Sequence, residues 1–312
     1  MKNFILDVDT GIDDACALLF AARHPEINLI GVTCVDGNTN LTQVVKNTFT
    51  VLNAAGAKNV PVAAGATRPL IQQRHTGAGV HGSDGLGGLS SEDLDQEMDP
   101  RPAVEMLRDL IERSSQPVTL IPMAPLTNIA LFLRAFPETA KKLERIVLMG
   151  GSATVGNATA TAEFNVWHDP EAAAIVFSSG IPITMYGLDV FDKLAMTQSE
   201  ARALINSGGT CGEFSGKLLD AHFSSDVTRF PTLGDYGAVA VALYPHLGTM
   251  KKYRVLVDTT FGPNRGQTIC DKRPFASLEL TGHEKGSAEV EVVVDIDVEA
   301  IKKLWIETVS GE

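Results

Sequence analysis

The stretch at residues 5–15 constrains the fold most, because it joins an apolar strand to a helix through a turn rich in aspartate. Residues 4–6 are apolar and predict a short buried strand. Helical spacing follows in four apolar residues: Ala15, Leu18, Leu19 and Ala22. Four acids lie in this stretch: Asp7, Asp9, Asp13 and Asp14. Since open α/β sheets bind ligands at the carboxyl ends of their strands, the turn predicts a ligand site.

Two roles explain an acid in this turn. Asp13 or Asp14 can cap the helix by accepting hydrogen bonds from its free N–H groups, but capping does not account for Asp7 and Asp9. Carboxylates packed this closely raise one another's pKa unless a cation lies between them. Because residues 5–15 offer only oxygen ligands, with no His or Cys, the sequence favours a Ca²⁺ or Mg²⁺ site over a Zn²⁺ site.

The composition narrows the class of partner. The chain has 312 residues and a net charge of −12, so we expect neither a nucleic acid nor an anionic membrane as partner. No apolar run reaches transmembrane length, and Asp7 comes too early for a signal peptide. We therefore expect a cytoplasmic protein. Four scattered cysteines agree with free thiols in a reducing compartment: Cys16, Cys34, Cys211 and Cys270.

Strands and helices alternate along the chain. The predicted strands are residues 4–6, 27–35, 60–65, 117–121, 145–149 and 181–187, with later β-rich segments at 253–259 and 290–296. The predicted helices are residues 41–55, 103–114, 126–136, 199–225, 232–243 and 298–309, with a further helix start at 169–173. The alternation, without a linker or internal repeat, predicts one α/β domain over residues 1–312. Its core is a mainly parallel open sheet with flanking helices.

Three further residues come at the ends of predicted strands, as the acid turn does. Asn38, Met123 and Met149 each come directly after a strand. In a parallel sheet the carboxyl ends of neighbouring strands share one edge, so these groups are expected to converge there. This convergence is stronger evidence for a site than any single residue.

Two later segments can add to the same site. The loop after residues 145–149 carries Asn157, Glu163 and Asn165, which either make turns in solvent or form a hydrogen-bonding cradle for a ligand rich in hydroxyls. Asp235 lies where a later helix begins. It either caps that helix or is a further acid for the metal.

Residues 66–100 differ from the rest of the chain, because they are rich in Gly, Ser and Asp and have few periodic apolar residues. Long irregular segments inside compact domains are usually lids or disordered. Residues 77–82 match the dinucleotide fingerprint G-x-G-x-x-G, but no strand precedes them and no clear helix follows, so we reject that assignment. We expect a mobile lid that carries His81; the alternative is an exposed loop histidine without a role.

Six short motifs stand out along the chain: Asp7-Val-Asp-Thr-Gly-Ile-Asp-Asp14, Gly37-Asn38, Pro125-Leu-Thr-Asn128, Met149-Gly-Gly151, Gly156-Asn157 and Ala162-Glu-Phe-Asn165. Together they resemble the inosine–uridine nucleoside hydrolases, from the N-terminus to about Asp235. The resemblance implies a Rossmann-like nucleoside hydrolase fold. It also implies a Ca²⁺-dependent N-ribohydrolase that splits a small-molecule ribonucleoside into base and ribose, assembled as a homodimer or homotetramer.

The resemblance also implies roles for single residues. Asp9 looks like both a Ca²⁺ ligand and the general base, which takes a proton from a water acidified by the cation. The other Ca²⁺ ligands look like Asp14, Asp235 and the main-chain carbonyl of Met123. The ribose-hydroxyl binders look like Asp13, Asn38, Asn157, Glu163 and Asn165. Met149 looks like a wall of the ribose pocket, and His81 matches a lid histidine found near the base.

One position departs from the family pattern. Many members have a His immediately before the late Asp, assigned to protonating the leaving base, whereas this sequence has Gly234. Glycine has no side chain that donates a proton, so leaving-group activation and base preference stay open. The nearby candidate donors are His81, His222 and Tyr236, each equally interpretable as a surface or packing residue.

Two other functions compete with this interpretation. The sequence from Asp7 to Thr10 also matches the D-x-D-x-T motif of haloacid-dehalogenase-like phosphatases, in which Asp7 would be a nucleophile working with Mg²⁺. That chemistry has no use for Asp13, Asp14 and the later Asn/Glu cradle. The second alternative is a nucleoside-binding protein without turnover, which Gly234 in place of the usual His would explain.

Overall fold

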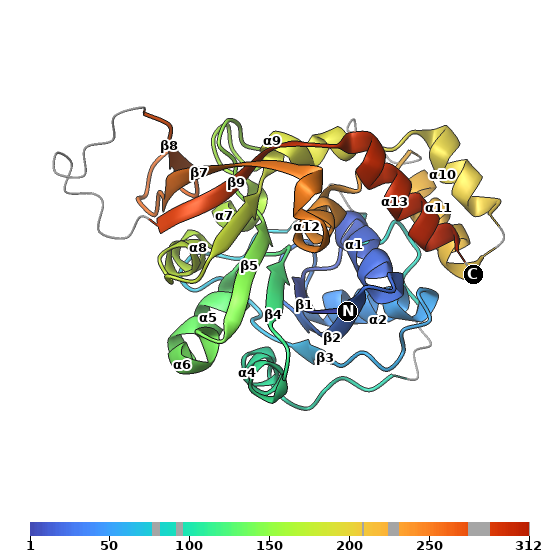
Figure 1. The fold of residues 1–312 in the computed structure, drawn as a ribbon, viewed down its shortest axis with the longest axis horizontal. Coiled ribbons are helices and arrows are strands. Elements are labelled where there is room, and N and C mark those ends of the chain that lie inside the picture. The colour runs from blue at the N-terminus through green and yellow to red at the C-terminus, as the bar shows by residue number, and fades with distance from the viewer. Residues whose placement is uncertain (77–81, 92–95, 208, 224–230, 274–287, 312) are drawn as a thin grey trace.

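The computed structural model describes residues 1–76, 82–91, 96–207, 209–223, 231–273 and 288–311. The strands are β1 (Lys2–Val8), β2 (Ile27–Cys34), β3 (Val62–Ala64), β4 (Val118–Pro122), β5 (Leu143–Met149), β6 (Ile183–Tyr186), β7 (Gly248–Val257), β8 (Thr268–Asp271) and β9 (Ala288–Ile296). They form one sheet of nine strands in the order β3-β2-β1-β4-β5-β6-β9-β7-β8 (Figure 1). From β3 to β9 neighbouring strands pair in parallel, whereas β7 is antiparallel to both β9 and β8.

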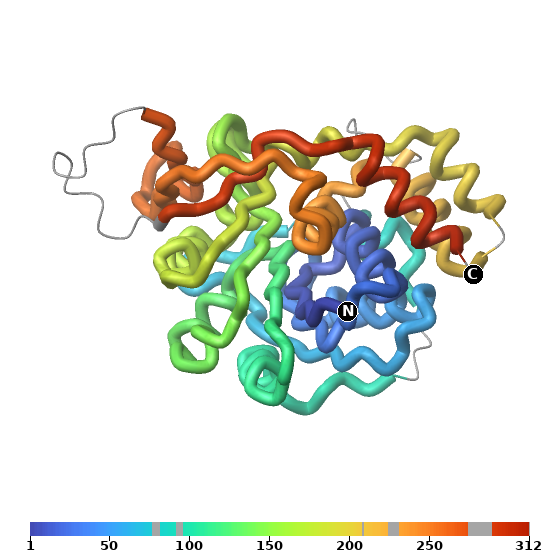
Figure 2. Tube along the Cα trace, viewed as in Figure 1, coloured from blue at the N-terminus to red at the C-terminus, as the bar shows by residue number. Residues whose placement is uncertain are grey.

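Helices cover both faces of this sheet (Figures 1 and 2). The helices in chain order are α1 (Ile12–Arg23), α2 (Leu41–Ala54), α4 (Ala103–Arg113), α5 (Thr127–Ala135), α6 (Pro137–Ala140), α7 (Phe164–His168), α8 (Pro170–Phe177), α9 (Leu188–Phe191), α10 (Gln198–Ile205), α11 (Thr210–Phe223), α12 (Gly234–Leu243) and α13 (Val298–Ser310). Two short 3₁₀ helices are η1 (Asp192–Leu194) and η2 (Pro245–Leu247). None of the helices among the described residues is long and apolar enough to span a membrane.

Alternation along the strands divides the core into two clusters, one on each face. On β1, Phe4 and Leu6 belong to the cluster that contains α1, α2 and α12, while Ile5 belongs to the cluster that contains α4, α5 and α8. On β5, Val147 and Leu148 are divided between the clusters in the same way. Because successive side chains of a strand point to opposite faces, a strand buried on both sides is apolar throughout, as parallel sheets require.

The connections place a switch point at the middle of the sheet. From β1 the chain first runs outward through β2 to β3, then returns to β4 on the other side of β1 and continues through β5 to β6. The loops after β1 and β4 therefore diverge, and the crevice between them is where open α/β sheets bind ligands. The acid turn follows β1, and Met123 follows β4.

The predicted α/β class with a mainly parallel open sheet is confirmed, with three local corrections. The region expected to be helical at 199–225 is divided into α10 and α11 up to Phe223, and its last two residues lie outside the described part of the chain. The helix expected at 126–136 ends at Ala135 and α6 starts anew at Pro137, where proline fits a first helical position. The antiparallel edge formed by β7 and β8 was not predicted, and β8 was missed altogether.

Candidate active site

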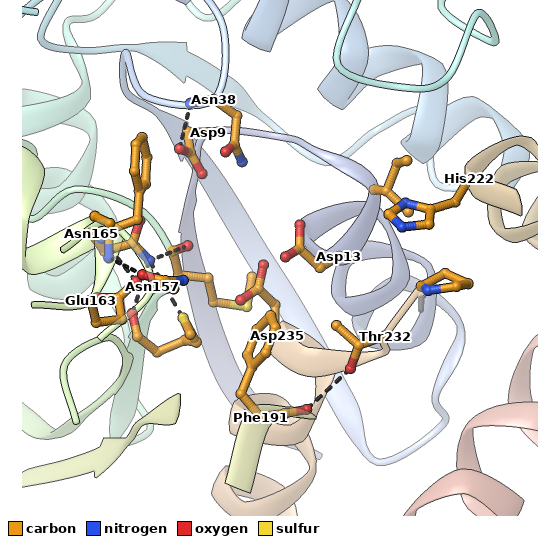
Figure 3. A pocket seen from close by; sticks show the side chains of 16 residues that line it. Asp9, Asp13, Asn38, Asn157, Glu163, Asn165, Phe191, His222, Thr232 and Asp235 are labelled. Atoms are coloured by element: carbon orange, nitrogen blue, oxygen red, sulfur yellow. Dashed lines mark hydrogen bonds between the residues drawn. The ribbon is translucent and has the colours of Figure 1, made fainter. Parts of the chain in front are cut away.

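A cavity of about 210 Å³ lies at the carboxyl edge of the sheet (Figure 3). Its lining includes nine of the residues predicted from the sequence: Asp9, Asp13, Asn38, Met123, Met149, Asn157, Glu163, Asn165 and Asp235. They come from loops after β1, β2, β4 and β5 and from the first turn of α12. Asp14 is fully buried beside this lining, where it accepts a hydrogen bond from the Asp9 amide. His81 lies outside the described residues, so its role stays a prediction.

The acid turn is fixed by the start of α1. One Asp14 carboxylate oxygen accepts from the Gly11 amide at 2.9 Å and the other from the Asp9 amide at 3.3 Å. Asp14 therefore does cap the helix, as one explanation of the acids proposed. The partial positive charge at a helix N-terminus favours this placement of Asp13 and Asp14. Capping uses Asp14, whereas Asp9 and Asp13 line the cavity.

Three carboxylates lie close enough to share a cation. One oxygen from each of Asp13, Asp14 and Asp235 lies within 4.8 Å of the others. Burial and the charge of Asp13 raise the pKa of Asp14 to about 8. Burial, followed by the charges of Asp13 and Asp14, also raises the pKa of Asp235 well above its ordinary value. Buried acids that repel one another in this way are stabilised by a cation, so the oxygen-only set suits a hard divalent metal.

Asp9 is positioned beside this cluster by the loop after β2. Its Oδ2 accepts a hydrogen bond from the Asn38 amide at 2.7 Å, whereas its Oδ1 is buried with no hydrogen-bond partner in the described part of the chain. Burial and the charge of Asp14 raise the pKa of Asp9 well above its ordinary value. Gly37 allows the close approach, because a Cβ there would lie 2.1 Å from Asp9 Oδ2. The unpaired oxygen is available to a metal or to a water.

Asp7 supports the site from below without lining the cavity. Its Oδ1 accepts from Thr33 Oγ1 at 2.5 Å and from Asn128 Nδ2 at 2.8 Å. Burial raises the pKa of Asp7 to about 7, despite these two hydrogen bonds. Asn128 also donates to the Cys34 carbonyl and accepts from the Ala66 amide, so it ties the ends of β1, β2 and β3 together.

The predicted polar cradle lies on the other side of the cavity from the acid turn. Glu163 is the N-cap of α7 and accepts from the amides of Asn165, Val166 and Gly151. Asn165 Nδ2 donates to the main-chain carbonyls of Met123 and Met149. Burial raises the pKa of Glu163 to about 7. This network fixes the direction of a carboxylate and an amide that face the cavity (Figure 3).

Sequence analysis missed the apolar part of the lining. The missed residues are Ile12, Ala158, Phe164, Phe191, Pro231 and Thr232, while His222 was named only as a candidate donor. Phe191 ends the helix that follows β6, so the rule that found Asn38 and Met149 also applies to it. An aromatic residue in that position resembles a core residue, and it is indeed only 4% exposed.

Comparisons with known proteins agree with this geometry. The sequence matches the family described as inosine-uridine preferring nucleoside hydrolase over residues 4–303. The chain belongs to this family. Pyrimidine-specific ribonucleoside hydrolase RihB of Escherichia coli is 34% identical over 300 residues, which cover 95% of this chain and 94% of that protein. Membership makes the protein an N-glycosyl hydrolase, as the resemblance implied, and removes the phosphatase alternative.

Solved structures of other nucleoside hydrolases superpose on this hydrolase over its whole length. A plant nucleoside hydrolase has a TM-score of 0.91 at 28% identity, covering 100% of this chain and 99% of the other. The purine-preferring ribonucleoside hydrolase from Gardnerella vaginalis has a TM-score of 0.88 at 32% identity, covering 99% and 98%. The relatives thus include hydrolases whose names give different base preferences, pyrimidine-specific for RihB and purine-preferring for the Gardnerella vaginalis enzyme.

The hydrolase has no room for a side chain at position 234. A Cβ on Gly234 would lie 2.0 Å from Cε2 of Phe191. In an open helix Gly→Ala stabilises by about 1 kcal/mol, but here overpacking is expected to cost about 1–3 kcal/mol. Gly234→Ala should therefore lower the free energy of unfolding in urea.

The matched control for this substitution is Gly262→Ala, where a Cβ would meet nothing within 4 Å. In a Phe191→Ala background the cost of Gly234→Ala should shrink, because the ring that blocks the methyl group is gone. An equal cost in both backgrounds would contradict the steric explanation.

Proposed function

We propose that this hydrolase cleaves the N-glycosidic bond of ribonucleosides with one bound Ca²⁺. The observation that carries the proposal is the close set of carboxylates from half-buried Asp13 and buried Asp14 and Asp235, which lies next to the unpaired oxygen of Asp9 and faces a polar cradle. A cation held there supplies positive charge that offsets the carboxylates and acidifies a water molecule.

The proposed metal ligands are Asp9, Asp14, Asp235 and the Met123 carbonyl. The Met123 oxygen accepts one hydrogen bond, from Asn165, and a carbonyl has a second lone pair. Asp9 also takes a proton from the attacking water as general base, for which its unpaired Oδ1 is suited.

The proposed ribose binders surround the place where C1′ would lie. They are Asp13, Asn38, Asn157, Glu163 and Asn165, with Met149 as a wall. Carboxylates close to C1′ stabilise the positive charge that develops on the sugar as the bond breaks. The hydrogen bonds that hold Glu163 and Asn165 before ligand arrives fix their orientation, which reduces the cost of ordering the site.

A panel of nucleosides tests the proposal. Release of ribose from inosine, uridine, cytidine and adenosine should occur with added Ca²⁺ and stop with excess chelator. Binding of ribosides without ribose release would support the alternative of a non-catalytic nucleoside-binding protein. Full activity in chelator would contradict the metal. The homodimer or homotetramer and the cytoplasmic location stay predictions, and sedimentation of the purified protein decides the first.

Ribosides should be cleaved much better than 2′-deoxyribosides. A site built to pair a hydroxyl leaves polar groups such as Asn165 and Glu163 with one hydrogen bond fewer when that hydroxyl is missing. Each missing hydroxyl is expected to cost about 1–3 kcal/mol. Equal kcat/KM for uridine and 2′-deoxyuridine would contradict the assignment of the cradle to the sugar.

A further inference from the structure

A leaving nucleobase needs a proton or an equivalent acceptor of charge, and position 234 does not supply one. The ring of Phe191 occupies the space in which a side chain on Gly234 would begin. Gly234 is the first residue of α12, and Phe191 lies against it. Phe191 also lines the cavity. This part of the cavity is therefore lined by an aromatic ring that donates no proton.

His222 reaches the same cavity from α11. It lies one turn after Leu218 and Leu219 on the buried face of that helix, is 7% exposed, and lines the cavity. In Figure 3 its imidazole extends toward Asp13 from the side of the cavity opposite to Glu163 and Asn165. The sugar cradle and His222 thus lie at opposite ends of one cavity, which is how a ribose and its base would be arranged.

Two hydroxyl groups near this end direct their protons to main-chain carbonyls and not into the cavity. Tyr236 is fully buried, donates to the Ile301 carbonyl at 3.0 Å, and does not line the cavity. The Thr232 hydroxyl donates to the Phe191 carbonyl at 3.1 Å. The carboxylates of Asp13 and Asp235 belong to the close acid cluster, and Asp9 is a proposed metal ligand. Among the described lining residues, His222 carries the imidazole, the side chain that acts most often as a general acid in enzymes.

We infer that His222 donates a proton to the leaving nucleobase, which lies against the ring of Phe191. The inference rests on the proposed function. As the C1′–N bond breaks, its electron pair goes to the base nitrogen and the imidazolium of His222 transfers a proton to an acceptor atom of the base. A water oxygen bonds to C1′ and gives a proton to Asp9. Proton exchange with solvent then restores both groups, so one nucleoside and one water yield ribose and a neutral base.

A split between two kinds of substrate tests the inference. The nucleobase of a natural ribonucleoside is a poor leaving group as an anion, whereas p-nitrophenyl riboside releases an anion that needs no proton. His222→Gln should lower kcat on inosine and uridine by about 10²–10⁴-fold, the usual contribution of general acid catalysis. The same variant should keep kcat on p-nitrophenyl riboside within about threefold of wild type, since water attack at C1′ is untouched.

The controls show whether a loss of activity comes from the chemical step or from misfolding, and whether it is specific to His222. His246→Gln replaces an exposed histidine on η2 and should change neither substrate. His222→Asn is the second variant if His222→Gln folds poorly, and p-nitrophenyl riboside turnover reports an intact site in either. Equal losses on both kinds of substrate, or no loss on either, would overturn the role of His222, as would a natural-substrate collapse in His81→Gln alone. A wild-type protein inactive on every riboside would remove the proposed function and this inference together.

Discussion

Asp9→Ala is expected to lower kcat on every riboside by about 10³-fold or more. General base catalysis alone is worth about 10²–10⁴-fold, and the substitution also removes a proposed metal ligand. In contrast to the His222 variants, this loss should be as large for p-nitrophenyl riboside as for inosine, because Asp9 acts on the attacking water and not on the leaving group. Steady-state kinetics on the two substrates, with saturating Ca²⁺, measure it.

The matched control is Asp295→Ala, which removes an exposed aspartate on β9 that pairs with Lys193. It should leave kcat within about twofold, since an exposed ion pair contributes little. Asp9→Asn keeps the size of the side chain and its contact with the Asn38 amide at one oxygen, so it separates loss of the base from loss of packing. An Asp9→Ala variant that keeps more than a tenth of wild-type turnover would exclude Asp9 as the base.

Local patterns were sufficient for most of the fold. The apolar runs that became β1, β4 and β5 are buried on both faces, which makes them continuous and easy to find. β8 has four residues, one of which, Ile269, is 45% exposed, so it carries no alternation that a sequence pattern can detect. Its pairing with β7 depends on contacts between distant segments, and the antiparallel edge was therefore not predictable.

The functional site likewise has residues that local sequence patterns predict and contacts between distant segments that they do not. Asp9, Met123 and Met149 were found because each lies at or just after the end of a strand and a parallel sheet brings strand ends together. The packing of the Phe191 ring against Gly234 could not be predicted in this way, because the ring fills the space of an absent side chain on a different helix. Sequence analysis identified Gly234 as a missing donor, and the structure adds that its space is already filled.

The metal-free hydrolase should be less stable at pH 8 than at pH 5. Asp7 and Glu163 have their pKa raised to about 7 and Asp14 to about 8, all from ordinary values near 4, because burial penalises the charged form. The folded state thus binds protons that the unfolded state has released. Stability from these groups is full below about pH 4 and is lost as pH rises to 7–8. One group should account for roughly 3 kcal/mol between pH 5 and pH 8.

His168 works in the opposite direction and has to be removed before the measurement. Burial lowers its pKa from 6.5 to about 4, and both ring nitrogens lack a hydrogen-bond partner in the described part of the chain. The unfolded state therefore gains a proton at this residue as pH falls below 6.5, which destabilises the fold in acid. His168→Leu places an apolar side chain in this fully buried position and eliminates the opposing titration of His168.

Urea unfolding of His168→Leu at pH 5 and pH 8, with chelator and with Ca²⁺, separates these effects. With chelator the unfolding free energy should fall from pH 5 to pH 8 by several kcal/mol. With Ca²⁺ at 100 times its Kd the folded state gains about 2.7 kcal/mol at pH 8, because the ionised carboxylates of Asp14 and Asp235 now face a cation. The gain should be small at pH 5, where protons compete for the same oxygens. Equal stability of the chelated variant at both pH values would show that ionising these buried carboxylates does not destabilise the fold. It would also show that their repulsion is not what attracts the metal.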